Sequence, residues 1–489
     1  MGFPRDSVIS ATIVLYVRSV YGLLVVGVGA YQGRGTYVTN TFATIIPPPL
    51  QPRSPKERNK LAPDDRSAHD WYRFILSFPP HLVCDYLDRF GANASTNVLD
   101  PFCGTGTTVV ECKKRWIPSV GIEMNPLAHF AGAVKTDWKP DSDGLLAHAD
   151  EIATIALAEL RSHGIEDDPS WNTYDEFCES SSKLRTLPPA TLKLLLANSI
   201  SPLPLHKTLT LLDALKRHPN QRYMRHELLA LAKALPFSIS NLRFGPEVGV
   251  GTVKLDVSVI STWHAGVVAI ANDLHTLSNR ASVPSVVHHA DARRLLEVLE
   301  PASIDIVITS PPYPNEKDYT RTTRLESVLL GFVNSKEELR ELKKGLVRSN
   351  TRGMYKGDDD DQWVADHAEI QRIAQEIEER RIELGKTSGF ERLYAKVTKL
   401  YFGGMTRHLA DLRAVLRPGA HLAYVVGDQA SYLRVMIRTG QLLADIAQSL
   451  GYEVVGIDLF RTRAATITKQ HLREEVVVLR WPGAEITPV

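Results

Sequence analysis

The 489-residue sequence predicts an α/β fold in which a mainly parallel sheet is interrupted by large, mainly helical insertions. Residues 98–123 have the pattern of a strand, a glycine-rich turn, a helix and a second strand that ends in an acid, which is typical of doubly wound sheets. Residues 304–309 form another apolar, strand-like run that leads directly into two prolines. Between these segments, residues 141–276 show the 3.6-residue apolar spacing of helices. We therefore expect one sheet domain whose halves are separated by a helical insertion.

The remaining elements follow from periodicity and turn signals. A helix is expected to begin after Pro79 and Pro80, because proline is tolerated in the first turn of a helix. Glycines break the long helical stretch at 243–254. Strands are expected at 286–290 and 304–309, and a charged helical insert at 335–387. The last part of the chain should contain a helix at 400–416, a turn at 417–419, a strand at 422–426, a helix at 441–450 and strands at 453–458 and 475–479.

Composition places the chain among ordinary globular proteins but does not identify a partner. Lysine and arginine number 57 against 56 acidic residues, so the net charge neither favours nor excludes a nucleic acid, and a basic groove could be balanced elsewhere. The 4 cysteines show no CxxC spacing. Neither a zinc site nor a disulfide framework is expected, and a reducing, cytoplasmic location is the natural interpretation.

Residues 9–31 are strongly apolar, but Arg18 and several glycines interrupt them. A signal peptide or membrane anchor usually has a cleaner apolar core and a basic start. We therefore disfavour a membrane segment and expect either a β-hairpin packed on the domain or a start codon assigned too far upstream. Residues 45–60 are rich in proline, arginine and lysine and are expected to form a linker.

The glycine-rich turn, DPFCGTGTT at 100–108, has the features of a cofactor loop. Gly104 and Gly106 allow the backbone to turn sharply and to approach a ligand closely. The following helix offers free N–H groups at its start. The third glycine of dinucleotide-binding loops is replaced by Val109, whereas Glu123 ends the next strand, where an acid can accept hydrogen bonds from both ribose hydroxyls of an adenosine.

The second motif is Ser310-Pro311-Pro312-Tyr313, directly after the strand at 304–309. Its prolines fix the backbone and remove donors, and carbonyls at the end of such a strand point into the ligand cleft. This arrangement suits a reaction at an exocyclic amine of a base. Such an amine is a poor nucleophile because its lone pair is delocalised into the ring. Hydrogen bonds from that amine to the Ser310 side chain and the Pro311 carbonyl would expose the lone pair, while Tyr313 stacks on a flipped base. No covalent nucleophile is required, because positioning and electrostatics lower the barrier.

Both motifs resemble those of the DNA amino-methyltransferases: DPFCGTGTT is similar to motif I, and the run SPPYPNEKDYTRTTRLE is similar to motif IV. The resemblance implies a Rossmann-like S-adenosylmethionine-dependent methyltransferase fold, S-adenosyl-L-methionine as cofactor, double-stranded DNA as substrate and a cognate restriction endonuclease as a possible partner. Serine before the two prolines is typical of cytosine-N4 enzymes, whereas Asp or Asn is more usual in adenine-N6 enzymes. We therefore favour cytosine N4 over adenine N6. Residues 71–82 look like motif X in a looser match, and we favour this over the alternative of core aromatics beside a helix-capping Pro-Pro pair.

The resemblance also implies roles for individual residues. Asp291, which follows the strand at 286–290, would reach the adenine amine of the cofactor or cap a helix, and it could do both. Cytosine-C5 chemistry is disfavoured because none of the cysteines follows a proline, and the reaction needs no metal. The cofactor-binding candidates are Asp100, Pro101, Phe102, Cys103, Gly104, Thr105, Gly106, Thr107, Glu123, Met124 and Asp291, and the catalytic candidates are Ser310, Pro311, Pro312 and Tyr313.

The position of target recognition stays open at this point, because roughly 200 residues separate the two motifs. Residues 141–280 and 335–395 compete for this role, and we favour the second because it follows the catalytic motif directly. The candidate DNA contacts are Arg321, Arg324, Arg348, Asn350 and Arg352.

The expected organisation has six parts. These are an N-terminal extension and linker (1–60), a cofactor-binding half (61–140), a mainly helical insertion (141–280), a catalytic half (281–334), a helical insert (335–395) and a C-terminal α/β part (396–489).

An alternative of another class is a tRNA guanine-N2 methyltransferase, because some of these enzymes pair a DPFCGTG loop with a later D-PPY motif. They carry Asp where this chain has Ser310, and they usually have a basic N-terminal RNA-binding domain. A degenerate, non-catalytic binding subunit is a further alternative, which the intact Glu123, Ser310 and Tyr313 argue against.

Overall fold

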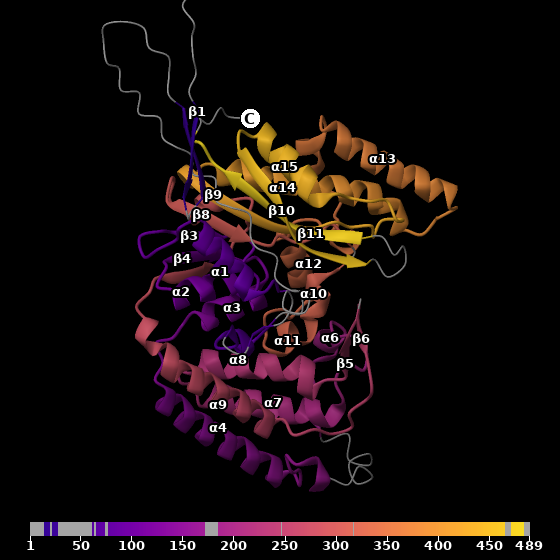
Figure 1. Cartoon of the computed structure of the whole chain (residues 1–489). Helices are drawn as coiled ribbons and strands as arrows, with labels where there is room; N and C mark the ends of the chain where they lie inside the picture. The colour runs from indigo at the N-terminus through magenta and orange to yellow at the C-terminus, as the bar shows by residue number, and fades with distance from the viewer. Residues whose placement is uncertain are drawn as a thin grey trace, which may run out of the picture.

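The computed structural model describes residues 14–19, 22–27, 61–62, 65–73, 77–171, 184–245, 247–315, 317–464 and 471–483. In this part of the chain the main feature is a seven-stranded sheet with the order β10-β11-β9-β8-β3-β4-β7. Helices cover both of its faces, and a separate layer of helices lies beneath one end (Figure 1). The strands are β3 (Val98–Asp100), β4 (Ser119–Ile122), β7 (Ser285–His288), β8 (Ile304–Thr309), β9 (Leu416–Gly427), β10 (Glu453–Ala464) and β11 (His471–Arg480).

The sheet brings the ends of β3 and β8 together. β3 pairs in parallel with β4 on one side and with β8 on the other, and β8 pairs in parallel with β9. β11 is antiparallel to both of its neighbours, β9 and β10. The strand order therefore reverses between β3 and β8, and a doubly wound sheet binds its ligands at such a switch point, beyond the carboxyl ends of the strands.

Alternating residues send their side chains to opposite faces of the sheet, as a strand requires. On one face Val98 and Ile306 pack with α1 (Pro80–Arg89) and α2 (Thr107–Lys114). On the other face Leu99 and Val307 pack with apolar side chains of the C-terminal helices. Those helices are α13 (Ala368–Glu383), α14 (Tyr394–Leu412) and α15 (Thr439–Ser449).

The long insertion has a hydrophobic core of its own. Its helices α4 (Ser142–Ser162), α7 (Pro202–Arg217), α8 (Met224–Ala234) and α9 (Ile260–Leu277) lie together below the sheet (Figure 1). Trp263 and Leu211 are buried in this core, which also includes Leu127 of α3 (Pro126–Lys135). The helix α3 follows β4, so the insertion core is continuous with the layer that carries the cofactor loop.

Short helices connect β8 to the C-terminal layer. They are α10 (Tyr319–Thr322), α11 (Arg324–Leu329), α12 (Lys336–Gly345) and the 3-10 helix η9 (Asp360–Val364). A further short helix, α6 (Pro189–Leu192), belongs to the long insertion.

Several expectations from the sequence need correction. The glycine-rich break at 243–254 contains a small hairpin, β5 (Leu242–Phe244) with β6 (Val248–Val250). Residues 417–419 lie within β9 rather than in a turn before it. Between two successive pairs, Ile304 with Leu416 and Ile306 with His421, β9 contains extra residues that form a bulge, and Gly419 there has a φ of 89°. The sequence pattern marked the turn residues correctly but could not show that the strand continues through them.

The apolar N-terminal segment contains the expected hairpin, in which β1 (Val14–Ser19) pairs antiparallel with β2 (Gly22–Gly27). Whether this hairpin packs on the domain, as the sequence suggested, lies outside what the structure describes, as does the linker at 45–60. Among the described residues, the structure has no helix that is both long enough and apolar enough to cross a membrane.

Candidate active site

Residues of both sequence motifs line one cavity of about 1400 Å³ at the carboxyl ends of the strands. Residues of the β3 loop, Glu123 and Met124 after β4, Asp291 after β7 and the SPPY segment after β8 all line this cavity. Of the cofactor candidates, Pro101, Phe102, Cys103, Gly104, Thr105 and Thr107 lie on its wall, whereas Asp100 and Gly106 do not. The structure therefore brings the two motifs together around a shared space, although roughly 200 residues separate them in the sequence.

The two glycines of the loop have different surroundings. Gly104 has a φ of 52° and lines the cavity, and a Cβ added there would meet no atom within 4 Å. Gly106 has a φ of 86° and faces α3, where an added Cβ would lie 3.1 Å from the Cα of Gly132. Gly104 thus provides the close approach to a ligand, and Gly106 provides the close approach between the loop and α3.

Asp100 offers a buried acceptor beneath the loop. Its Oδ1 accepts hydrogen bonds from the Thr309 hydroxyl at 2.6 Å and from the Phe102 amide at 3.2 Å. Its Oδ2 is buried and has no hydrogen-bond partner among the residues that the structure describes. Burial raises the pKa of Asp100 to about 6, against the opposing effect of the Thr309 hydroxyl. An unsatisfied buried oxygen is costly, and this one lies beneath the loop rather than on the cavity wall.

Glu123 connects the end of β4 to the cofactor loop. Its Oε2 accepts from the Gly104 amide at 2.8 Å and its Oε1 accepts from the Asn125 amide at 2.7 Å. Each oxygen keeps a lone pair for a further donor, as two ribose hydroxyls would require. Burial raises the pKa of this carboxyl to about 7, although the backbone donors act in the opposite direction.

Lys135 is a residue of the site that the sequence did not reveal. It is fully buried on α3, and its Nζ donates to the Thr105 carbonyl at 2.7 Å. Burial lowers the pKa of its ammonium group to about 7. Cys103 is also buried in the loop, and a Cβ on Gly121 would lie only 2.4 Å from its sulfur. The Cys103 thiol therefore fills the space that the absence of a side chain on Gly121 leaves.

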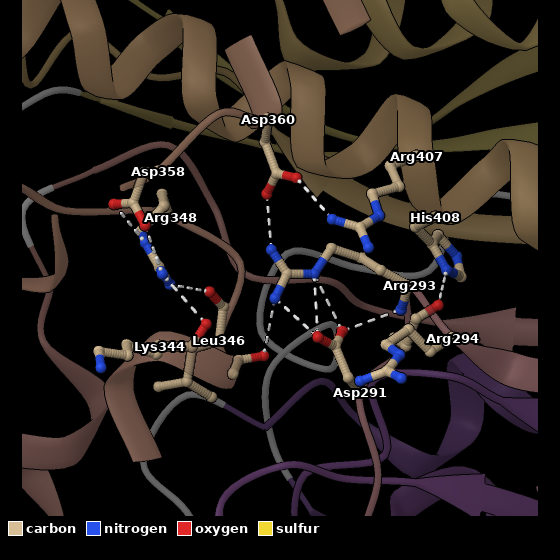
Figure 2. Close-up of polar contacts among 12 residues, drawn as sticks. Asp291, Arg293, Arg294, Lys344, Leu346, Arg348, Asp358, Asp360, Arg407 and His408 are labelled. Carbon is tan, nitrogen blue, oxygen red and sulfur yellow. Dashed lines mark hydrogen bonds and ion pairs between the residues drawn. The ribbon is translucent and has the colours of Figure 1, made fainter. Parts of the chain in front are cut away.

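Asp291 lies in a network of buried charges (Figure 2). It accepts from the amide of Arg293 at 2.9 Å and from the guanidinium of the same residue, with Nη2 to Oδ2 at 2.7 Å. It therefore closes a tight local turn and does not cap a helix as the sequence allowed, because the next helix, η7 (Leu295–Glu297), begins after Arg294; it also lines the cavity. The neighbouring Ala292 carbonyl is held by His408, which packs edge-on against Phe102 with ring centroids 4.8 Å apart.

In the SPPY segment, the Ser310 hydroxyl donates to the Val425 carbonyl of β9 at 3.1 Å. This bond uses the proton of the hydroxyl and directs it away from the ligand, so the oxygen can accept from an amine. Tyr313 packs against Gly427, where an added Cβ would lie 3.0 Å from the ring. Burial raises the pKa of Tyr313, so its ring is neutral near pH 7.

The segment compared with motif X does reach the cavity. Tyr72, Arg73, Ser77, Phe78 and Pro79 lie on its wall, and residues 74–76 lie outside the described part. The Tyr72 hydroxyl donates to Glu326 of α11 at 2.9 Å, which connects this segment to the region after the SPPY motif.

Two of the five candidate DNA contacts, Arg324 and Arg348, use their guanidinium groups for hydrogen bonds within the chain. Arg324 donates to the Thr320 and Leu194 carbonyls, and Arg348 donates to Asp358 and to the last carbonyls of α12. Their guanidinium groups have internal partners, so we revise both from DNA contacts to residues that hold the site together.

Arg321 and Arg352 both approach Glu247, with Nη1 to Oε2 distances of 3.9 and 3.6 Å. Asn350 is buried beside the cavity, where its amide nitrogen donates to the Lys317 carbonyl at 3.2 Å. Its Oδ1 has no hydrogen-bond partner among the described residues.

The two regions that compete for target recognition border the same cavity. Glu247 comes from the β5–β6 hairpin of the long insertion, while residues 345–350 and side chains on and after α13 come from the second insert. The described residues contain no group of three or more His, Cys, Asp or Glu side chains arranged to hold a metal ion.

Comparison with known proteins finds DNA methyltransferases among the proteins similar to this chain. Residues 34–130 match the family described as DNA methylase (N6_N4_Mtase). The chain is 25% identical over 451 residues to Type II methyltransferase M.BsoBI of Geobacillus stearothermophilus, covering 85% of this chain and 84% of that protein. It is 23% identical to Type II methyltransferase M.AvaI of Anabaena variabilis, covering 87% and 88% of the two chains.

Among solved structures, the rRNA methyltransferase aviRa of Streptomyces viridochromogenes shares 10% identity and a TM-score of 0.28, covering 83% of this chain and 85% of that one. So low a score carries no argument about fold or function. The fold assignment depends instead on the strand order of the sheet and on the position of the cavity at its switch point.

Proposed function

We propose that the chain is a DNA amino-methyltransferase and that it methylates cytosine N4 within a specific sequence of double-stranded DNA. One observation carries the proposal: the SPPY segment and the glycine loop face one cavity, with the Ser310 oxygen oriented as an acceptor. Serine at this position favours cytosine N4 over adenine N6 as the methylated atom. Relatives named Type II methyltransferases support a restriction–modification role with a cognate endonuclease as partner.

S-adenosyl-L-methionine, when bound, supplies an electrophilic methyl group on a positively charged sulfur. We assign its amino acid part to Asp100 and the loop backbone, its ribose to Glu123 and its adenine to the region of Asp291. The open space beside Gly104 on the cavity wall supports this assignment of the loop.

The protein's part in the reaction is to position and activate the base amine. The base must leave the duplex to reach the cavity, and stacking on Tyr313 would offset part of the cost of unstacking. The amine would donate to the Ser310 oxygen and the Pro311 carbonyl, which concentrates the lone pair on nitrogen. These contacts strengthen as positive charge develops on the amine, so they stabilise the transition state more than the ground state.

We infer that Asn350, which lines the cavity, contacts the flipped base. Its amide nitrogen is already committed to the Lys317 carbonyl, which fixes the orientation of the side chain and leaves Oδ1 as an acceptor. A buried acceptor of this kind discriminates between bases because a base without a matching N–H would leave it unpaired.

The test uses the purified full chain, unmethylated DNA of mixed sequence and methyl-labelled cofactor. The DNA is digested to nucleosides, and mass spectrometry identifies the labelled base. We expect N4-methylcytosine, and we expect Ser310→Ala to lower the rate by on the order of 10²-fold because one transition-state hydrogen bond is lost. The matched control is Ser95→Ala, which removes an exposed hydroxyl in the turn before β3 and should leave the rate unchanged.

Other outcomes would overturn parts of the proposal. Labelled N6-methyladenine would retain the mechanism and change the base. Label in tRNA but none in DNA would replace the DNA assignment with the RNA alternative. Cofactor binding without transfer to either nucleic acid would identify a non-catalytic binding subunit.

A further inference from the structure

Arg293 connects three segments of the chain that are distant in sequence (Figure 2). Its Nε and Nη2 donate to Asp291, its Nη2 also donates to the Gly345 carbonyl at 3.2 Å, and its Nη1 donates to Asp360 at 2.6 Å. Asp291 follows β7, Gly345 ends α12 and Asp360 begins η9. One buried guanidinium thus links the wall of the cavity to the second insert at two points.

Asp360, the contact of Arg293 in the second insert, is held in place by α14. Asp360 also receives the Arg407 guanidinium of α14 at 3.3 Å. Two glycines of α14 make room for this approach: a Cβ on Gly403 would lie 1.8 Å from the Asp360 carbonyl oxygen, and one on Gly404 would lie 3.2 Å from its Oδ2. The side chain of Asp360 is 6% exposed, so its charge depends on these two arginines.

A second guanidinium fixes the segment that follows Gly345. Arg348 donates to the Lys344 carbonyl at 3.0 Å and to Asp358 at 2.8 Å (Figure 2). Two residues further along, Asn350 donates to the Lys317 carbonyl of the loop after the SPPY motif. Residues 345–350 therefore run from the Arg293 link to the proposed base site along the cavity wall.

Arg293 does not itself line the cavity, whereas Asp291 does. Any influence of Arg293 on a ligand in the cavity must therefore pass through Asp291 or through residues 345–350. The side chains of Arg293 and Asp291 are 8% and 18% exposed, so solvent screens this pair little.

We propose that Arg293 is a positioning residue that couples the cofactor pocket to the second insert by holding Asp291 and residues 345–350 in one arrangement. A cofactor contact at Asp291 then favours the same position of the insert that a target base needs at Asn350. The coupling is reciprocal, because linkage requires each ligand to favour the binding of the other by the same factor. This inference rests on the cofactor site proposed above.

The first experiment measures the Kd of S-adenosyl-L-methionine by calorimetry on the full chain without DNA. Arg293→Gln should weaken binding by about tenfold, and Asp360→Asn should weaken it severalfold although Asp360 lies outside the cavity lining. In an Asp291→Ala background, Arg293→Gln should change the Kd less than twofold, because its path to the cofactor is already broken.

Two control variants separate positioning from loss of stability. Arg372→Gln removes an exposed guanidinium that pairs with Glu369 and Glu376 on α13, and it should leave the Kd unchanged. Ile373→Val weakens the buried core of the same helix and lowers Tm without touching Arg293. A Kd that follows Tm equally in Ile373→Val and Arg293→Gln would show a merely structural role and overturn the proposal.

The second experiment measures backbone hydrogen exchange with and without the cofactor. We expect cofactor to protect residues 345–350 in the unaltered chain and to lose this effect in Arg293→Gln. Protection that persists in the variant contradicts the coupling. If the unaltered chain binds no S-adenosyl-L-methionine, the proposed function fails together with the inference, whereas unchanged affinity in Arg293→Gln overturns the inference alone.

Discussion

Glu123 combines a structural and a binding role in one carboxyl group. Its two oxygens accept from the Gly104 and Asn125 amides, so it holds the cofactor loop against the start of α3. The same oxygens are the proposed acceptors for two ribose hydroxyls. The ionised form serves both roles best, since a protonated carboxyl would replace one acceptor with a donor.

Cofactor affinity should therefore depend on the protonation of Glu123. Because burial raises its pKa to about 7, the group is ionised above that pH and takes up a proton below it. We expect the Kd of S-adenosyl-L-methionine to rise as pH falls from 8 to 6, and Glu123→Gln to bind more weakly with this pH dependence removed. Calorimetry across this range checks both statements, and an equal pH dependence in the variant would assign the titration to another group.

Short segments with strong local patterns predicted Asp100, Glu123 and Ser310 as site residues. The structure places Glu123 and Ser310 on one cavity wall and Asp100 beneath the loop, and their roles stay predictions. Lys135 and Arg293 were missed because their roles depend on partners far along the chain, Thr105 for one and Asp360 for the other. The only local signal for Lys135 is a single lysine at the end of a mainly apolar helix, which solvent exposure would explain equally well.

At the scale of elements, the approach of α2 and α3 depends on two facing glycines. The Cα of Gly132 lies where a side chain on Gly106 would project, and Gly106 has a left-handed backbone conformation. The loop and α3 therefore pack as closely as backbone atoms allow. Lys135, one turn further along α3, uses this proximity to reach the Thr105 carbonyl.

The two loop glycines should respond differently to alanine. Gly106→Ala combines backbone strain with a clash against α3, so we expect a loss of about 2 kcal/mol in the free energy of unfolding. Gly104→Ala meets no neighbouring atom, so its loss of stability should be smaller, while its methyl group occupies the cavity and weakens cofactor binding. Denaturant unfolding and calorimetry on both variants distinguish the two effects, and equal losses of stability would contradict this assignment.

Prediction of elements was reliable for long periodic segments and weaker at breaks. The helices of the insertion and the strands around both motifs were found because burial on one face leaves a clear period in the sequence. The β5–β6 hairpin was missed because its strands are only three residues each. The sequence also did not show that β11 is antiparallel, since strand direction depends on tertiary pairing.

At the scale of the whole molecule, both insertions contribute residues to the lining of one cavity, so neither borders it alone. Glu247 of the first insertion approaches Arg321 and Arg352, two candidate DNA contacts. Its side chain is 50% exposed, and those of the arginines are 34% and 35% exposed, so these charges remain accessible to phosphates. A carboxylate at this position opposes the approach of DNA through its own charge and by competing for both cations.

Glu247→Gln should therefore strengthen DNA binding by severalfold at low salt, with the gain shrinking as salt rises and screens the interaction. Fluorescence anisotropy with labelled duplex DNA at several salt concentrations measures this effect. Glu369→Gln, which alters an exposed ion pair on α13, is the matched control and should change affinity little. An unchanged or weakened affinity for Glu247→Gln would show that the two arginines do not contact DNA.

Roughly 160 residues connect the adjacent parallel strands β4 and β7. A crossover between two such strands needs only about a dozen residues. As a flexible chain, a connection of this length would cost about 2 kcal/mol more loop-closure entropy than the short one. Folding of the insertion around Trp263 reduces that cost, because its compact core brings the ends of the two strands together. The helical insertion thus holds the two strands together, and the stability of β4, which leads directly into Glu123, is tied to the hydrophobic core of the insertion.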